Sequence, residues 1–164
     1  MESTRQARLD RIAAALGYSF DGEIRIGGDY VPVVRDGRTA YVSGQVPRIG
    51  TTVVVTGRAG ADVSLQDAQR GAQVCAIRGL LLLKQALGSL EAIEQVLRVG
   101  VYVKSADGFT QQSEVADAAS ALLKDVLGPA GAHTRTSVGV YELPKGATVE
   151  VEMTVRTREG GDVQ

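Results

Sequence analysis

The sequence contains one cysteine, Cys75, and one histidine, His133, among its 164 residues. A single cysteine excludes an internal disulfide framework and a zinc site built from several cysteines. A single histidine excludes histidine-rich metal sites, and it leaves only those Ser-His-Asp arrangements that use His133 itself. We therefore expect neither a disulfide scaffold nor a multi-cysteine metal centre.

The sequence also lacks long apolar runs and a large excess of charge of either sign. The leucine run 80–83 is far shorter than the roughly 20 residues that a membrane-spanning helix needs. Lys and Arg (18) nearly balance Asp and Glu (19), and hydrophobic residues make up 44% of the chain. Disordered chains are less hydrophobic and more highly charged, and proteins that coat nucleic acid are usually basic. We expect a folded protein with no membrane partner, and nucleic acid is an unfavoured partner.

The start of the chain, residues 1–17, is charged and lacks the apolar core of a secretion signal. The length suits one domain, since single domains commonly hold on the order of 100–150 residues. We therefore expect a soluble protein of the cytoplasm.

Three helices are predicted from apolar periodicity, over residues 3–16, 64–87 and about 109–127. Ser3 and Gln6 have the spacing of a capping box for the first helix. Ser64 can cap the second helix, and Gly88 can end it. Cys75 lies on the apolar side of this helix, where a lone cysteine usually acts as a small hydrophobe.

β-Branched residues predict a short extended piece at 31–34 and strands at 38–46, 51–56, 96–104, 134–141 and 148–156. The order predicts an α+β domain, with a mixed sheet of about six strands and both main helices on one face. Valines alternate in the last two strands, so an apolar second face would favour oligomerisation.

Two segments carry a more specific resemblance. YVSGQVP (41–47) and HTRTSVGVYELPKGATVEVE (133–152) resemble signature stretches of the RidA/YjgF family, and the similarity spans about residues 30–157. It is nearest to a branch with an N-terminal extension that is described as chorismate-mutase-like or endoribonuclease. The resemblance implies a chorismate-mutase-like domain at 23–158, preceded by a helical extension at 1–22. The last residues, EGGDVQ, are expected to form a flexible tail at 159–164. It also implies a homotrimer whose intersubunit clefts hydrolyse reactive imines.

Arg135 and Glu150 are the candidate catalytic residues. An arginine fork binds a carboxylate with two parallel hydrogen bonds, and the resemblance implies that Arg135 holds the carboxylate of the substrate. The resemblance places Glu150 where the family orients or activates the hydrolytic water, and burial could raise its pKa enough for a base. The residues alone leave two alternatives open: an arginine in a surface salt bridge, and two solvated glutamates, Glu150 and Glu152.

Five further residues are candidates for substrate binding. Tyr30, Ser43 and Gly44 match pocket positions of the family, although Ser-Gly in a strand more often indicates a bulge. Ser137 stands where many imine-hydrolysing members have a cysteine, and Ser113 where they have an asparagine. These two departures concern the identity of the substrate more than the fold.

His133 precedes Arg135 and could line the cleft or assist proton transfer, but a loop histidine is more often a bystander.

The leading hypothesis is hydrolysis of a small 2-imino or enamine carboxylate to a keto acid and ammonia, without a metal or organic cofactor. A second hypothesis is a non-catalytic module that binds a small carboxylate metabolite in the trimer clefts. A third hypothesis is an endoribonuclease. The sequence gives it little support, because it shows no paired histidines, no cluster of metal-binding carboxylates and no excess of basic residues. Chorismate mutation has only fold analogy in its favour.

Overall fold

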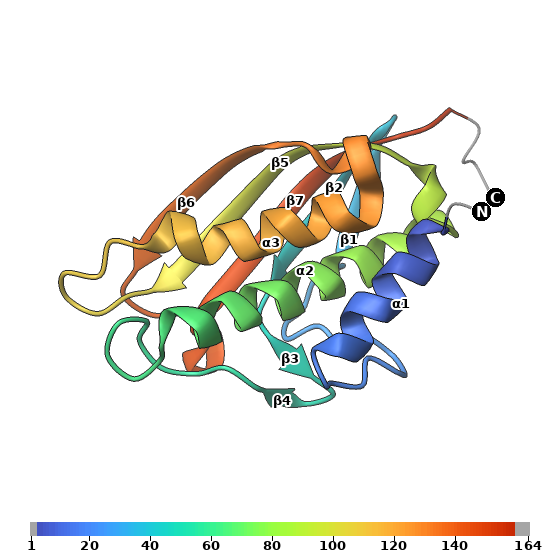
Figure 1. Ribbon diagram of the computed structural model, residues 1–164. Helices are drawn as coiled ribbons and strands as arrows, with labels where there is room; N and C mark the ends of the chain where they lie inside the picture. The colour runs from blue at the N-terminus through green and yellow to red at the C-terminus, as the bar shows by residue number, and fades with distance from the viewer. Residues whose placement is uncertain (1–2, 160–164) are drawn as a thin grey trace.

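The computed structural model describes residues 3–159, which form a five-stranded mixed sheet with helices on one face (Figure 1). The sheet contains β1 Val33–Asp36, β2 Thr39–Gln45, β5 Ile93–Lys104, β6 Thr134–Val140 and β7 Val149–Thr157. The α-helices are α1 Arg5–Ala15, α2 Leu65–Leu87 and α3 Gln112–Leu127. The 3-10 turns are η1 Leu90–Ala92, η2 Gly128–Gly131 and η3 Pro144–Gly146. A separate small hairpin pairs β3 Arg48–Ile49 with β4 Thr52–Val53.

The strand order of the main sheet is β1-β2-β7-β5-β6. β5 and β6 are parallel, and the three other pairings are antiparallel. A parallel pair needs a crossover connection, and here α3 supplies it between β5 and β6. Both α2 and α3 lie on the same face of the sheet (Figure 1). The predicted α+β architecture is therefore confirmed.

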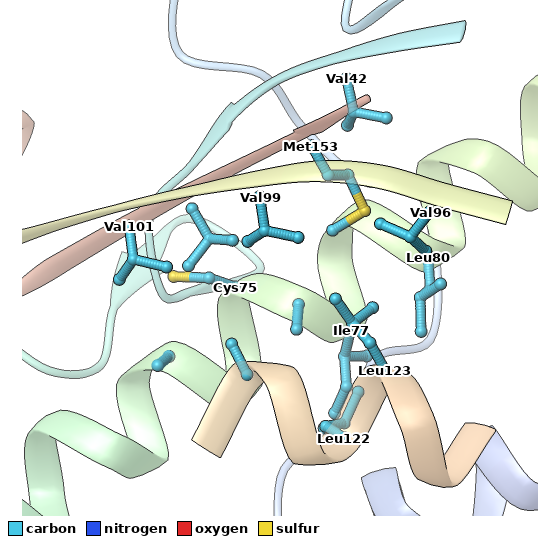
Figure 2. Close-up of a cluster of buried hydrophobic side chains, with 14 of the residues drawn as sticks. Val42, Cys75, Ile77, Leu80, Val96, Val99, Val101, Leu122, Leu123 and Met153 are labelled. Atoms are coloured by element: carbon cyan, nitrogen blue, oxygen red, sulfur yellow. The ribbon is translucent and has the colours of Figure 1, made fainter. Parts of the chain in front are cut away.

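The core lies between this face of the sheet and the two long helices. Figure 2 shows Cys75 and Leu80 of α2 beside valines of β5, and Ile77 of α2 beside Leu122 and Leu123 of α3. Ser64 caps α2 by accepting a hydrogen bond from Asp67 N at 3.1 Å, and Gly88 ends it with a positive φ of 84°. Cys75 is fully buried, which confirms its interpretation as a core residue, and burial raises the pKa of its thiol well above the ordinary value.

Helix α1 is joined to the body of the domain by a buried arginine. Arg5 is only 7% exposed, and its Nη1 donates to Leu90 O at 2.9 Å and to Ile93 O at 2.7 Å. The capping box predicted at Ser3 is wrong: Thr4 is the N-cap, and its hydroxyl accepts from Ala7 N. The helix therefore starts at Arg5, two residues later than predicted.

The segment 51–56 does not form the strand that its valines predict. Only Thr52 and Val53 are in a strand, and they pair with β3 outside the main sheet. Val55 instead packs against Gly71 of α2, where a Cβ atom would lie 3.3 Å from it. Burial under a helix has overridden the local β propensity of this segment.

The prediction of an apolar second face is also wrong for β7. Because side chains alternate along a strand, its valines at 149, 151 and 155 face the helices and are buried. The face without helices carries Glu150, Glu152 and Thr154, which are half-buried or exposed. Large exposed hydrophobic side chains remain elsewhere: Tyr30, Val31, Val34, Tyr41, Val138 and Tyr141.

Within residues 3–159, no helix is both long enough and apolar enough to cross a membrane. Of the expected tail 159–164, residues 160–164 lie outside the described residues.

Candidate functional site

A β-bulge in β2 positions the first part of the site. Val42 pairs with Met153 and Gln45 with Val151, so that two residues, Ser43 and Gly44, lie opposite a single residue of β7. The bulge interpretation of the Ser-Gly step is thus correct. Bulges are frequent beside active sites because they redirect side chains.

Gly44 lies directly against Glu150. A Cβ atom at Gly44 would overlap the carboxylate of Glu150, so glycine is the residue that leaves room for this side chain. Glu150 is half-buried, and burial, followed by the charge of Glu152, raises its pKa above the ordinary value. A carboxylate with a raised pKa is a better proton acceptor than an ordinary one.

Glu150 lines a pocket of about 170 Å³ at the end of β2. Tyr30, Gly44 and Glu150, three of the residues predicted from the sequence, all contribute to it. The other polar side chains of the lining are Gln45, Arg25, Arg48, Arg78 and Lys145.

This basic lining was not predicted from the sequence, and Arg78 is its most buried member. Arg78 Nε donates to Gln45 Oε1 at 3.3 Å, and Gln45 Nε2 donates to the Ser43 hydroxyl at 3.2 Å. These two hydrogen bonds connect Arg78 of α2 to the bulge in β2. A signal was available, since Arg78 follows Cys75 by three residues and therefore lies near it on the apolar side of α2.

Ser43 itself faces a second hollow, of about 450 Å³, on the side of the sheet without helices. Glu152 also lines this hollow, and its Oε1 accepts a hydrogen bond from the Tyr102 hydroxyl at 2.7 Å. This hydrogen bond is the largest cause of a raised Tyr102 pKa. Ser43 therefore lies between this hollow and the pocket of Glu150.

Arg135 lies in a different polar cluster, between β6 and α3. Its Nη1 donates to Asp117 Oδ1 at 2.9 Å and to Ser120 Oγ at 3.0 Å, and its Nη2 donates to Ser113 Oγ at 2.8 Å. The side chain of Arg135 is 17% exposed, whereas that of Asp117 is 65% exposed. Arg135 thus forms the salt bridge that the alternative interpretation allowed. The structure also brings it together with Ser113.

His133 supports the same cluster. Its Nδ1 contacts the carbonyl of Gly131 at 2.6 Å, and a carbonyl only accepts, so Nδ1 carries the proton of the neutral ring. Its Nε2 then accepts from the Ser120 hydroxyl at 2.8 Å, while Ser120 accepts from Arg135. Burial lowers the pKa of His133, which favours this neutral form. His133 therefore orients Ser120, and through it Arg135.

Within one chain, Arg135 and Glu150 do not meet. Arg135 pairs with Val99, whose side chain is buried against the helices, whereas Glu150 pairs with Tyr102 on the opposite face. The two strands are also separated by β5. Ser137 lies two residues after Arg135 on the same face of β6 and is half-buried. One chain therefore holds these residues in two separate places, the cluster around Arg135 and the pocket of Glu150, here called the two half-sites.

The sequence profile described as Endoribonuclease L-PSP matches residues 22–157. Protein TCP17 of Trypanosoma cruzi is 39% identical over 128 residues, which cover 77% of this chain and 80% of that protein.

Among solved structures, Atu1372 of Agrobacterium tumefaciens, of unknown function, has a TM-score of 0.83 and 35% identity, covering 94% of this chain and 92% of that one. The structure of E. coli TdcF with bound serine has a TM-score of 0.59 and 19% identity, covering 81% and 91%, and shares the fold. This chain belongs to the endoribonuclease L-PSP family, the RidA/YjgF family that the segments around Ser43 and Arg135 indicate.

Proposed function

We propose that the chain hydrolyses small 2-imino or enamine carboxylates to keto acids and ammonia, in clefts between the subunits of a homotrimer. The observation that carries this proposal is the environment of Glu150. Its carboxylate lies over Gly44 in a small pocket beside Tyr30, and its pKa is raised by burial. A half-buried carboxylate with a raised pKa, facing a small pocket, suits the role of a general base.

The need for a second copy follows from the placement of the two half-sites. Because Arg135 and Glu150 face opposite sides of the sheet, a cleft that uses both takes one from each of two subunits. Exposed hydrophobic side chains on the strands, Val34, Tyr41 and Val138, support burial against such a neighbour.

In the proposed reaction, Arg135 binds the carboxylate of the substrate and Glu150 takes a proton from a water molecule. The water oxygen bonds to the imine carbon, and Glu150 passes the proton to the imine nitrogen, which gives a carbinolamine. Glu150 then transfers the hydroxyl proton of the carbinolamine to nitrogen as the carbon–nitrogen bond breaks, so that the imine and one water give a keto acid and ammonia. Such imines already hydrolyse in water, so positioning and one base are sufficient.

The remaining predicted residues have supporting roles in this proposal. Ser113 and Asp117 hold the guanidinium of Arg135 in a fixed orientation. Tyr30, Ser43 and Ser137 supply hydroxyl groups for the polar parts of the ligand. The serine bound to TdcF carries an α-carboxylate, the group that Arg135 would bind here.

The test is to generate 2-aminoacrylate in situ with a dehydratase and to follow its loss with and without this protein. We expect acceleration by the wild type, a loss of roughly 100-fold or more in Glu150→Gln, and a reduced rate in Arg135→Ala. Glu94→Gln is the matched control, because Glu94 contacts Arg38 and Arg156 at the other end of β5.

No acceleration by the wild type, or an unchanged rate in Arg135→Ala, would overturn the proposal. Thermal stabilisation by a small carboxylate that depends on Arg135, but without turnover, would instead indicate a non-catalytic binding protein.

A further inference from the structure

The pocket around Glu150 has a large excess of positive charge. It is lined by Arg25, Arg48, Arg78 and Lys145 but by a single carboxylate, that of Glu150. The whole chain, in contrast, has more acidic than basic residues. In the part of the chain that the structure describes, none of these four cationic side chains forms an ion pair with a carboxylate. A narrow site lined by one sign of charge attracts ligands of the other sign.

Arg78 is the most buried of the four, at 3% exposed. Its three hydrogen bonds all go to uncharged acceptors: Gln45 Oε1 at 3.3 Å, Arg48 O at 2.9 Å and Arg25 O at 2.7 Å. A guanidinium has five N–H groups, so two remain beyond these three contacts. A buried cation without a counterion is costly, and a bound anion would remove that cost.

Arg48 supplies an independent observation. Its Nε is buried and has no hydrogen-bond partner in the described part of the chain. The loop 25–30 packs closely over the same side chain, since a Cβ atom at Gly27 would lie 3.1 Å from Arg48 Nη2. A buried donor without an acceptor is rare in proteins, and an acceptor from outside the chain, such as water or an anion, would satisfy it.

Lys145 reaches the pocket from the η3 turn. Among the described residues, it is the one non-glycine residue with a positive φ, at 58°. Lysine rarely adopts this left-handed conformation, and such conformations cluster at ligand-binding sites. Thus a strand, a helix, a loop and a turn each contribute one positively charged residue to the lining of one small pocket.

We propose that Arg25, Arg48, Arg78 and Lys145, here called the cationic wall, bind a second anionic group of the ligand, a carboxylate or a phosphate. This inference rests on the proposed function for the position of the first carboxylate, which Arg135 binds. The reacting carbon then lies near Glu150, and the anionic end of the side chain lies against the cationic wall. The preferred substrates are imines of acidic amino acids rather than of small apolar ones.

Binding of keto acids, the products of the proposed reaction, tests the inference apart from catalysis. We compare 2-oxoglutarate, which has a second carboxylate, with 2-oxobutyrate, which has none, by calorimetry on the full chain. The wild type is expected to bind 2-oxoglutarate at least about tenfold more tightly, since each charge-assisted contact is strong. 3-Phosphohydroxypyruvate carries a phosphate in place of the second carboxylate, and the tighter-binding compound of the two identifies the preferred anion.

The variants are Arg48→Gln and Lys145→Asn, because Arg78 holds the loop and the β3 strand in place and its replacement could prevent folding. Asparagine tolerates the left-handed conformation of position 145. Each variant should lose most of the preference for 2-oxoglutarate and keep its affinity for 2-oxobutyrate. Arg11→Gln, an equal change of charge on the exposed face of α1, should keep the preference.

Equal affinity of the wild type for all three keto acids would overturn the inference, as would an unchanged preference in both variants. The proposed function is judged separately, by the loss of 2-aminoacrylate. If the protein prefers keto acids with a second anionic group but does not accelerate imine hydrolysis, the cationic wall remains a binding site and only the catalytic proposal is refuted.

Discussion

The carboxylate of Glu150 occupies the space that any side chain at position 44 would need. Gly44 belongs to the β2 bulge, and Glu150 belongs to the neighbouring strand β7. The same arrangement occurs two residues further along β7, at Glu152. A Cβ atom at Gly100 of β5 would lie 2.8 Å from Glu152 Oε1. Each glutamate on this face of β7 thus has a glycine beside it, but Glu150 is the one that lines the smaller pocket.

Gly44→Ala should displace Glu150 and lower kcat at least about tenfold, because small shifts of a catalytic group are costly. The crowding should also reduce the free energy of unfolding by about 1–3 kcal/mol. Imine hydrolysis and urea unfolding measure the two effects. Gly100→Ala is the matched control, since it crowds Glu152 instead and should retain most of the activity. Equal loss in both variants would contradict a special role for Glu150.

The activity should rise with pH through the raised pKa of Glu150, because the base works in its charged form. Glu152 is the second cause of this raised pKa. Glu152→Gln should therefore shift the rising limb of the kcat/KM profile to lower pH, since one negative charge is removed. The same profile in the wild type and the variant, or a shift to higher pH, would show that Glu150 is not the group that titrates.

His133 should make the folded state less stable in mild acid. Its pKa is lowered in the folded state, so the unfolded chain binds more protons as the pH falls through about 6.5. The stability that depends on neutral His133 is present above this pH and is lost as the pH falls through the lower, folded value. Urea unfolding at pH 7.5 and at pH 5 should show a smaller pH-dependent change in His133→Gln. An equal pH-dependent change in the wild type and in His133→Gln would show that a group other than His133 titrates.

Cys75 should be unreactive in the folded protein, because it is fully buried and its thiol pKa is raised. A thiol reagent such as Ellman's reagent should label it only after denaturation. Cys75→Ser should cost about 1–3 kcal/mol of stability, since it places a hydroxyl among apolar side chains. Rapid labelling of the native protein would contradict this account of the core.

Local signals were sufficient to predict the long helix α2, where Ser64 and Gly88 mark both ends. They failed at Val55, whose β propensity lost to burial against α2. The spacing from Cys75 could indicate a buried arginine at position 78, but not the cationic wall, because Arg78 is held by backbone carbonyls of Arg25 and Arg48, 53 and 30 residues away. Contacts over such separations depend on the tertiary fold.

The motif around Arg135 indicated individual site residues rather than elements of the fold. It predicted residues of the site, and the structure places Tyr30, Gly44 and Glu150 in one pocket and Arg135 with Ser113 in another cluster. Periodicity showed that Glu150 and Glu152 share a face, but not which face of the sheet the helices cover. That assignment needed the pairing of β5 with β6 and β7.

The central claim is that Arg135 of one copy and Glu150 of another form one catalytic cleft. It is tested most directly by refolding Arg135→Ala and Glu150→Gln together in equal amounts and measuring imine hydrolysis. The mixture should then reach about a quarter of the wild-type rate, above the rate of either variant alone, because one cleft in four receives both intact residues. No recovery in a mixture that has demonstrably assembled into mixed oligomers would contradict the shared site.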